Sequence, residues 1–146
     1  LIASDGARLS HVLHGVIAPP PRQQLASRLH DIFAALSDVI DAHRPDEAAV
    51  EETFVNANAR AALALGQARG VALAAAARGG LSVAEYAPAT IKKAVVGSGS
   101  ADKAQIAFMV RRLLPSAGEV SADAADALGV AICHAAHGGF QRRAGV

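Results

Sequence analysis

Short apolar runs that favour strands alternate with long helical patterns along this chain, and this alternation limits the folds that it can adopt. The dipeptide Asp5-Gly6 lies between two apolar runs and predicts a hairpin whose second strand extends from about Arg8 to Ile17. Two further strands are expected at 46–52 and 81–86, and helices at 23–43, 58–77, 88–95, 101–115 and 121–139. This order predicts an α/β fold in one domain, with a mixed sheet covered by helices.

The expected helices differ in the size of their apolar residues. In the first helix, bulky residues recur every three or four positions, at Leu25, Leu29, Ile32, Phe33, Leu36 and Ile40. The 58–77 helix is rich in small residues, and its few bulky ones are Leu63, Leu65, Val71 and Leu73. Small residues let helices approach closely, so this helix is expected either at a tight intrachain contact or at a helix–helix interface.

Composition narrows the class of protein. Hydrophobic residues make up 52% of the 146 residues, which is typical of a folded chain. Cys133 is the single cysteine, which excludes an intrachain disulfide framework and suits a reducing compartment. Arg69 and Arg78 interrupt the longest apolar stretch, which is therefore not expected to span a membrane.

Charge is distributed unevenly, although the net charge is only +1. Residues 1–59 carry 4 basic and 8 acidic side chains, whereas residues 60–146 carry 10 basic and 5 acidic side chains. A basic second half suits a polyanionic partner such as nucleic acid, but lysines and arginines on ordinary solvated faces give the same count. The charge pattern alone leaves both interpretations open.

Two aspartates stand three residues apart at the start of the last expected helix, in the stretch SADAADALGVAICHAAHGG. Asp123 and Asp126 are therefore expected on one face of that helix. Acidic residues in a first turn can cap free N–H groups and interact favourably with the helix dipole. Two facing carboxylates also repel each other unless a cation lies between them, and carboxylate oxygens suit Mg²⁺. With a glutamate from a strand end, they would form a metal site of the kind that nucleases use.

Other candidate residues follow the 46–52 strand. Glu51 and Glu52 end this strand at an edge where ligands bind in open sheets, but solvated strand-end charges are the common alternative. Strand alternation directs the two side chains to opposite faces, so only one of them can point into a given site. Phe54 follows in an expected loop, where it is either a core side chain or a platform on which a base stacks.

The glycine-serine stretch GSGSADK, residues 97–103, leads into a helix. Its N–H groups and Lys103 could hold a phosphate, or the stretch could be a turn with a solvated lysine. It lacks the Gly-Lys-Ser/Thr ending of a nucleotide-binding P-loop and does not follow a strand, which argues against ATP or GTP. Lys92 and Lys93 are adjacent, so a helix directs them to different sides.

The six histidines do not indicate a zinc site. His11 and His14 are expected on opposite sides of a strand, and His134 and His137 have a helical spacing without an evident third ligand. Cys133 lies in an apolar helical run, where it is expected to pack in the core and not to act as a nucleophile.

Four stretches together resemble the RuvC family of bacterial Holliday-junction resolvases: AVEETF, ALALGQARGVAL, IKKAVVGSGSADKAQIAFMVRRLL and SADAADALGVAICHAAH. They follow one another in register from about Ala48 to His137, which is far more specific than any single motif. The resemblance implies an RNase H-like fold with a mixed five-stranded sheet flanked by helices. It also implies a homodimer that cuts two opposed strands of a four-way junction and leaves 5′-phosphate and 3′-hydroxyl ends.

The resemblance assigns roles to individual residues. The family's catalytic, metal-binding carboxylates are matched by Glu51, Asp123 and Asp126. An aromatic residue that contacts DNA near the junction centre is matched by Phe54, and basic residues implicated in DNA contact and activity are matched by Lys92 and Lys103. The implied cofactor is Mg²⁺, with two ions in each active site and Mn²⁺ as a possible substitute.

One departure from the family concerns its first catalytic aspartate. That aspartate lies on the first strand in a Gly-Ile/Val-Asp-Pro-Gly motif, which this sequence does not contain. Asp5 lies in the hairpin turn and is not its equivalent. We therefore expect that the central first strand is missing from the sequence, which then carries three of four metal ligands and could be inactive without that strand.

The function that these observations favour is Mg²⁺-dependent resolution of Holliday junctions during recombination and repair in the bacterial cytoplasm. The implied partners are four-way junction DNA, a second copy of the chain, and the RuvA and RuvB branch-migration proteins, with no membrane partner. Two alternatives remain open. One is a junction-binding module of the same fold without catalysis, and the other is a nucleotide-binding protein of the same superfamily.

Overall fold

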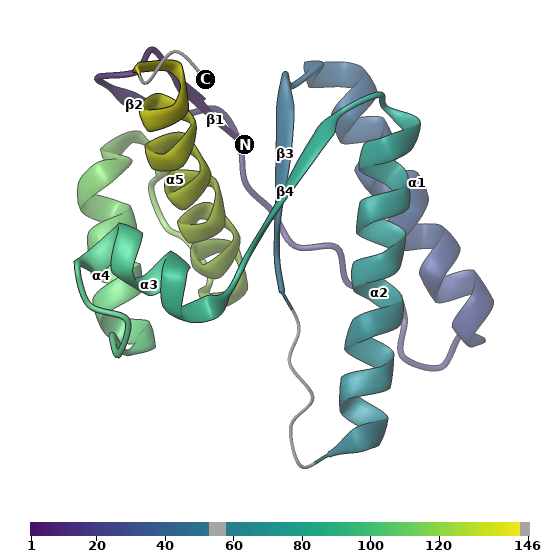
Figure 1. Cartoon of the computed structure of the whole chain (residues 1–146). Coiled ribbons are helices and arrows are strands. Elements are labelled where there is room, and N and C mark those ends of the chain that lie inside the picture. The colour runs from purple at the N-terminus through teal and green to yellow at the C-terminus, as the bar shows by residue number, and fades with distance from the viewer. Residues whose placement is uncertain (53–57, 144–146) are drawn as a thin grey trace. The chain divides into compact units, whose positions relative to one another are not determined.

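The computed structural model describes the backbone of residues 1–52 and 58–143, and the side chains of these residues up to residue 138. Figure 1 shows the elements, which are β1 (Ile2–Ser4), β2 (Leu9–His11), α1 (Leu25–His43), β3 (Glu47–Glu51), α2 (Ala59–Arg78), β4 (Ser82–Tyr86), α3 (Pro88–Val96), α4 (Lys103–Leu113), the 3₁₀ turn η1 (Pro115–Ala117) and α5 (Ala122–Arg143). Each strand and helix expected from the sequence is confirmed. The boundaries differ by a few residues, except that β2 is much shorter than expected.

The chain divides into two compact units. Unit 1 consists of Leu1–Val16 and Tyr86–Val146, and unit 2 consists of Ile17–Glu85. The antiparallel hairpin β1–β2 lies in unit 1, and β3 pairs with β4 in unit 2. The described strands do not form one mixed sheet. Backbone hydrogen bonds join β1 only to β2, and β3 only to β4. The expectation of a single domain stays a prediction.

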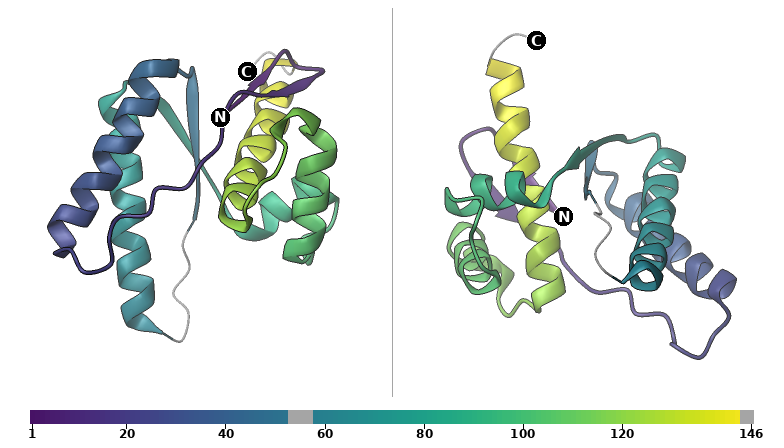
Figure 2. Two further views of the ribbon diagram at one scale, coloured as in Figure 1. Left: turned by 180° about the vertical axis from the view of Figure 1, so that it is seen from behind. Right: turned by 60° about the horizontal axis from the view of Figure 1, so that its bottom comes forward.

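Unit 2 is a β-α-β arrangement with an additional helix. Helix α2 connects β3 to β4, both strands run in the same direction, and α1 lies beside α2 (Figures 1 and 2). Small residues make the contact between the helices, because Ala75 and Ala76 are buried and a Cβ atom on Gly79 would lie 2.6 Å from Ile40 Cγ2. The C-terminal half of α2 therefore makes the tight intrachain contact that was one of its two expected roles.

An ion pair also joins α1 to α2 at the surface. Arg78 Nη1 and Nη2 donate hydrogen bonds to the two carboxylate oxygens of Asp41, at 3.1 and 3.0 Å. These bonds lower the pKa of the Asp41 carboxyl group. Helix α1 then ends at His43, and Arg44 adopts the left-handed conformation with a φ of 45° immediately before Pro45.

Unit 1 is built around α5, against which α3 and α4 pack (Figure 2). Apolar side chains fill its core, and the largest of those that are fully buried are Leu114, Leu128, Val110 and Cys133. The hairpin contacts α5 through β1 and contacts η1 through β2. No helix in the described part of the chain is long and apolar enough to cross a membrane.

The hairpin turn forms as predicted, but β2 is shorter than predicted. The Asp5 carboxylate accepts hydrogen bonds from two backbone N–H groups of the turn, at 3.0 and 2.7 Å, and these bonds lower its pKa. The expected strand to Ile17 is wrong, because β2 ends at His11. Among the described strands β2 pairs only with β1, and Ile2 at the start of β1 pairs with His11, the last residue of the regular strand pairing.

Candidate functional site

The two candidate aspartates lie at the start of α5. Ser121 precedes the helix, and its Oγ accepts a hydrogen bond from the Ala124 N–H group at 3.3 Å. Among the described residues, neither Asp123 nor Asp126 accepts a hydrogen bond from a helix N–H group. Ser121 therefore supplies the cap that was the alternative explanation for the aspartates. Asp123 is exposed and Asp126 is half-buried, so both carboxylates reach solvent from one helix face.

Lys103 lies beside one of these aspartates. Its Nζ is 3.5 Å from Asp126 Oδ2, and both residues belong to unit 1. The Lys103 side chain is 81% exposed and that of Asp126 is 41% exposed, so water screens the pair and its contribution to stability is small. Lys103 is also the first residue of α4, where the positive end of the helix dipole disfavours a cation. The interpretation of Lys103 as a merely solvated lysine is incomplete, since it has a carboxylate partner.

The N-terminus of α4, one of two alternatives for a phosphate contact, is capped by its own side chains. The Asp102 carboxylate accepts a hydrogen bond from the Gln105 N–H group at 2.8 Å, and the Gln105 side chain accepts one from the Asp102 N–H group at 2.9 Å. This capping box satisfies the N–H groups of Asp102 and Gln105. A phosphate placed there would meet the Asp102 carboxylate, so the Lys103 side chain is the better candidate for a phosphate contact.

The third candidate carboxylate, Glu51, lies in unit 2. It is the last residue of β3 and is exposed, whereas Glu52 is half-buried. Arg69 of α2 donates a hydrogen bond from Nε to the Glu51 carbonyl oxygen at 2.9 Å. The Nη2 group of Arg69 forms an ion pair with the Glu85 carboxylate of β4. From the sequence, Arg69 stands out only as an interruption of an apolar run. An arginine flanked by small residues, Ala68 and Gly70, was the signal that could have indicated its half-buried position.

The remaining predicted DNA contacts are distributed as follows. Lys92 is half-buried in α3 and Lys93 is exposed, which confirms that the helix directs them to different sides. Phe54 lies outside the described residues.

The first of the two histidine pairs does not lie as expected. His11 Nε2 and His14 Nδ1 are 2.8 Å apart, so the expectation that these rings point to opposite sides is wrong. The strand ends at His11, and strand alternation therefore does not continue to His14. Burial, followed by the neighbouring His14, lowers the pKa of His11. In α5, His134 Nδ1 lies 2.9 Å from the Tyr86 hydroxyl group.

Cys133 packs in the core, as expected. Its side chain is fully buried, and this burial raises the pKa of the thiol. The thiol therefore stays protonated near neutral pH, which is unsuitable for a nucleophile. His137 Nδ1 lies 2.8 Å from the Cys133 carbonyl oxygen, so one nitrogen of that ring is engaged within the helix.

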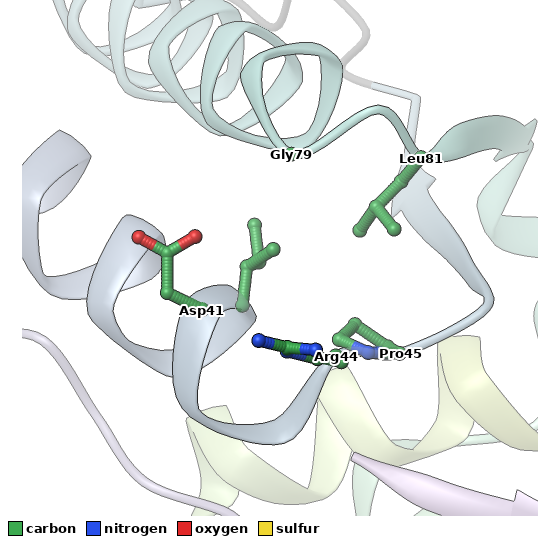
Figure 3. A pocket seen from close by; sticks show the side chains of 6 residues that line it. Asp41, Arg44, Pro45, Gly79 and Leu81 are labelled. Carbon is green, nitrogen blue, oxygen red and sulfur yellow. The ribbon is translucent and has the colours of Figure 1, made fainter.

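A pocket in unit 2 is separate from all predicted site residues. It has a volume of about 420 Å³ and lies between the end of α1 and the turn from α2 to β4 (Figure 3). Its lining residues are Ile40, Asp41, Arg44, Pro45, Gly79 and Leu81. Figure 3 shows a wide opening between these side chains, and none of them was predicted to bind metal or DNA.

The donor chemistry of the candidate carboxylates fits a hard divalent cation. Asp123 and Asp126 offer only oxygen atoms, which Mg²⁺ prefers, and both are accessible to solvent. Within the described residues, no group of three or more His, Cys, Asp or Glu side chains is placed to hold a metal ion. The observed set is therefore a pair of carboxylates on α5, with Glu51 on the other unit.

Comparisons with known structures define the class of protein. A structure of Thermus thermophilus RuvC in complex with a Holliday junction substrate matches with a TM-score of 0.87 and 32% sequence identity, over 95% of this chain and 86% of that chain. A second Thermus thermophilus RuvC structure matches with a TM-score of 0.81 and 30% identity, over 96% of this chain and 85% of that chain. The chain is therefore an α/β protein with the RNase H-like fold of these nucleases.

Sequence comparisons define the family. The family model for crossover junction endodeoxyribonuclease RuvC matches residues 1–134. A protein of that name from Caulobacter sp. strain K31 is 60% identical, over 92% of this chain and 80% of the relative. Another, from Acidiphilium cryptum strain JF-5, is 59% identical over 94% of this chain and 82% of the relative. This chain belongs to the crossover junction endodeoxyribonuclease RuvC family.

Proposed function

We propose that this protein is an endonuclease that resolves Holliday junctions during recombination and repair. The observation that carries this conclusion is the family match over residues 1–134, and the likeness to a RuvC structure with a Holliday junction substrate supports it. The substrate is four-way junction DNA, and the reaction is hydrolysis of one phosphodiester bond in each of two opposed strands. We place this reaction in the bacterial cytoplasm, because the chromosomal DNA lies there.

Glu51, Asp123 and Asp126 are proposed to act together as Mg²⁺ ligands. Mg²⁺ in enzymes of nucleic acids and nucleotides is commonly held by one or two carboxylates together with substrate phosphate oxygens, so the pair on α5 suits it without a closed protein cage. When bound, a pair of such ions supplies an activated water and stabilises the leaving oxygen, and Mn²⁺ can take the place of Mg²⁺. The carboxylates contribute the negative charge that collects these cations beside the DNA.

The basic residues are proposed to hold the phosphate backbone. The Lys103 ammonium group carries three N–H donors and lies beside Asp126, so it can contact a phosphate oxygen close to a ligand carboxylate. Lys92 on α3 is proposed as a second phosphate contact. Phe54 is proposed to stack on a base near the junction centre, as the family resemblance implies.

A variant that keeps shape but loses charge tests the carboxylate assignment. In the full-length protein, Asp123→Asn should reduce junction cleavage by more than the roughly 10–100-fold that outer-shell changes cost, because an amide is a poor Mg²⁺ ligand. Junction binding, measured by gel shift or fluorescence anisotropy without metal, should be nearly unchanged. Glu119→Gln removes an exposed carboxylate outside the proposed site and should leave cleavage unchanged. Normal cleavage by Asp123→Asn would contradict the assignment.

A homodimer is proposed because two symmetric cuts require two active sites related by a two-fold axis. The N-terminal half of α2 carries apolar side chains that are not covered within the chain, since Leu63 and Leu65 are 64% and 59% exposed. We place this half of α2 at the interface. The branch-migration proteins RuvA and RuvB are proposed as further partners on the strength of family membership.

Of the two alternative functions, nucleotide binding loses support, and junction binding without catalysis is distinguished by an assay. The missing P-loop ending of GSGSADK already argues against a nucleotide-binding protein, and the Asp102 carboxylate of the capping box adds negative charge at the start of α4. A junction-binding module without catalysis predicts that the full-length protein binds junctions but never cuts them at any Mg²⁺ or Mn²⁺ concentration. The cleavage assay above distinguishes that alternative directly.

A further inference from the structure

One arginine joins the ends of both strands of unit 2. Arg69 lies within α2, and its guanidinium group donates to the Glu51 carbonyl oxygen at the end of β3. The same group forms an ion pair with Glu85, one residue before the end of β4. Figure 1 shows α2 lying along this strand pair, and α2 contacts β3. Arg69 is thus bonded to the backbone of a residue that is proposed to bind metal.

This bond restrains the backbone of Glu51 at the point where β3 ends. Since the peptide group after Glu51 is planar, the direction of its carbonyl group fixes the ψ angle of Glu51. That angle sets the orientation of the peptide that follows relative to the Glu51 Cα–Cβ bond. The Arg69 fork is rigid, and Glu85 holds its other side, so the guanidinium can orient the strand end.

A second arginine on the same helix makes a useful contrast. Arg78 also pairs with a carboxylate, that of Asp41, but the partner lies on α1 and not on a strand. Its side chain is 47% exposed, whereas that of Arg69 is 21% exposed. Surface ion pairs of the Arg78 kind contribute little, so a mostly covered arginine with a backbone acceptor calls for a different explanation.

We propose that Arg69 is a positioning residue that orients the Glu51 carboxylate for metal binding, and that Glu85 orients Arg69. This inference rests on the proposed role of Glu51 as a metal ligand. Arg69 does not touch substrate or metal in this role; it acts through the backbone of Glu51. Lysine cannot replace it fully, because an ammonium group is a point charge without the two-sided fork.

Metal titration of the full-length protein tests the inference without relying on activity. Isothermal titration calorimetry with Mn²⁺ should show about 10–100-fold weaker binding for Arg69→Gln, the range found when partners of metal ligands are removed. Arg69→Lys and Glu85→Gln should each show a smaller loss, because one side of the arrangement remains. The cleavage rate of all three should recover as the Mn²⁺ concentration is raised, whereas junction affinity without metal should change less than about twofold.

Arg78→Gln is the matched control, since it removes an ion pair from the same helix without touching a strand end. It should lower thermal stability about as much as Glu85→Gln and leave the Mn²⁺ affinity unchanged. Equal Mn²⁺ affinity in the Arg69 and Arg78 variants would overturn the inference and leave Arg69 with a purely structural role. If Arg69→Gln does not fold, Arg69→Lys and Glu85→Gln decide by the same comparison.

Glu51→Gln separates this inference from the proposed function. Unchanged Mn²⁺ affinity in Glu51→Gln means that Glu51 is not a ligand, and the proposed metal site fails together with the inference. A loss of Mn²⁺ affinity in Glu51→Gln without any loss in the Arg69 variants refutes the inference alone. A loss in both supports both.

Discussion

Lys103→Ala can separate an effect on DNA binding from an effect on folding, because the substitution should change the free energy of unfolding very little. The substitution removes the 3.5 Å contact with Asp126, which as an exposed pair contributes at most about 1 kcal/mol. It also removes a cation from the first position of α4, where the helix dipole disfavours positive charge by about 0.3–1 kcal/mol. The two effects oppose each other, so the melting temperature should change by only a few degrees.

The effect on junction binding should be visible in its salt dependence. One lost phosphate contact reduces the slope of log affinity against log salt by about 0.9 on duplex DNA. When salt is raised from roughly 50 to 200 mM, the variant should therefore lose about threefold less junction affinity than the unmodified protein. The loss should be similar for junctions of any sequence, since a phosphate contact carries no sequence information.

Fluorescence anisotropy with a labelled junction, at four or more salt concentrations and without divalent metal, measures this slope. Lys93→Ala is the matched control, because Lys93 is an exposed lysine of α3 that is not proposed to contact DNA. Its slope should equal that of the unmodified protein. An unchanged slope in Lys103→Ala would refute the phosphate contact and leave Lys103 as the partner of Asp126 alone.

Two further predictions concern packing and assembly. Gly79→Ala should destabilise the fold by about 1–3 kcal/mol in urea denaturation, because its Cβ would lie 2.6 Å from Ile40 Cγ2, whereas Gly70→Ala, with no neighbour within 4 Å, should stabilise it by about 0.5–1 kcal/mol. Ile40→Leu removes the branch that clashes and should restore part of the loss, and equal effects of the two glycine variants would contradict the packing argument. Leu65→Asp should yield folded monomers in light scattering at micromolar concentration, whereas Phe108→Asp, at a similarly exposed position on α4, should remain dimeric. A monomer mass for the unmodified protein would exclude the proposed dimer.

Local sequence patterns predict the elements well, because their causes lie within a few residues. The spacing of apolar residues from Leu25 to Ile40 defines α1, and the Asp5-Gly6 turn defines the hairpin. The length of β2 was not predictable in this way, since a strand ends where its partner ends. The contact between His11 and His14 follows from that early end.

The contacts of the candidate site residues depend on tertiary structure and could not be predicted from local pattern. The carboxylates Glu51, Asp123 and Asp126 were identified from motifs, and the resemblance added their roles. Nothing in the sequence places Lys103 beside Asp126, because the two residues are 23 positions apart and meet through the packing of α4 on α5. Arg69 and Glu51, which are 18 positions apart, are joined in the same way by the packing of α2 on β3.

The chain uses charge sparingly, and the charges that oppose local preference are the informative ones. Lys103 stands at the end of a helix where a cation is disfavoured, and Arg69 is mostly covered on a helix made largely of small residues. Charged residues in unfavourable positions require compensation by a partner or a function. Lys103 pairs with the Asp126 carboxylate. Arg69 pairs with the Glu85 carboxylate and also donates to the Glu51 backbone, so each of the two cations has one contact with a proposed metal ligand. Arg78, in a favourable position at the end of α2, contacts none of these ligands. The contrast between Arg69 and Arg78 therefore supports the positioning role of Arg69, which itself rests on the metal-site assignment that Glu51→Gln tests.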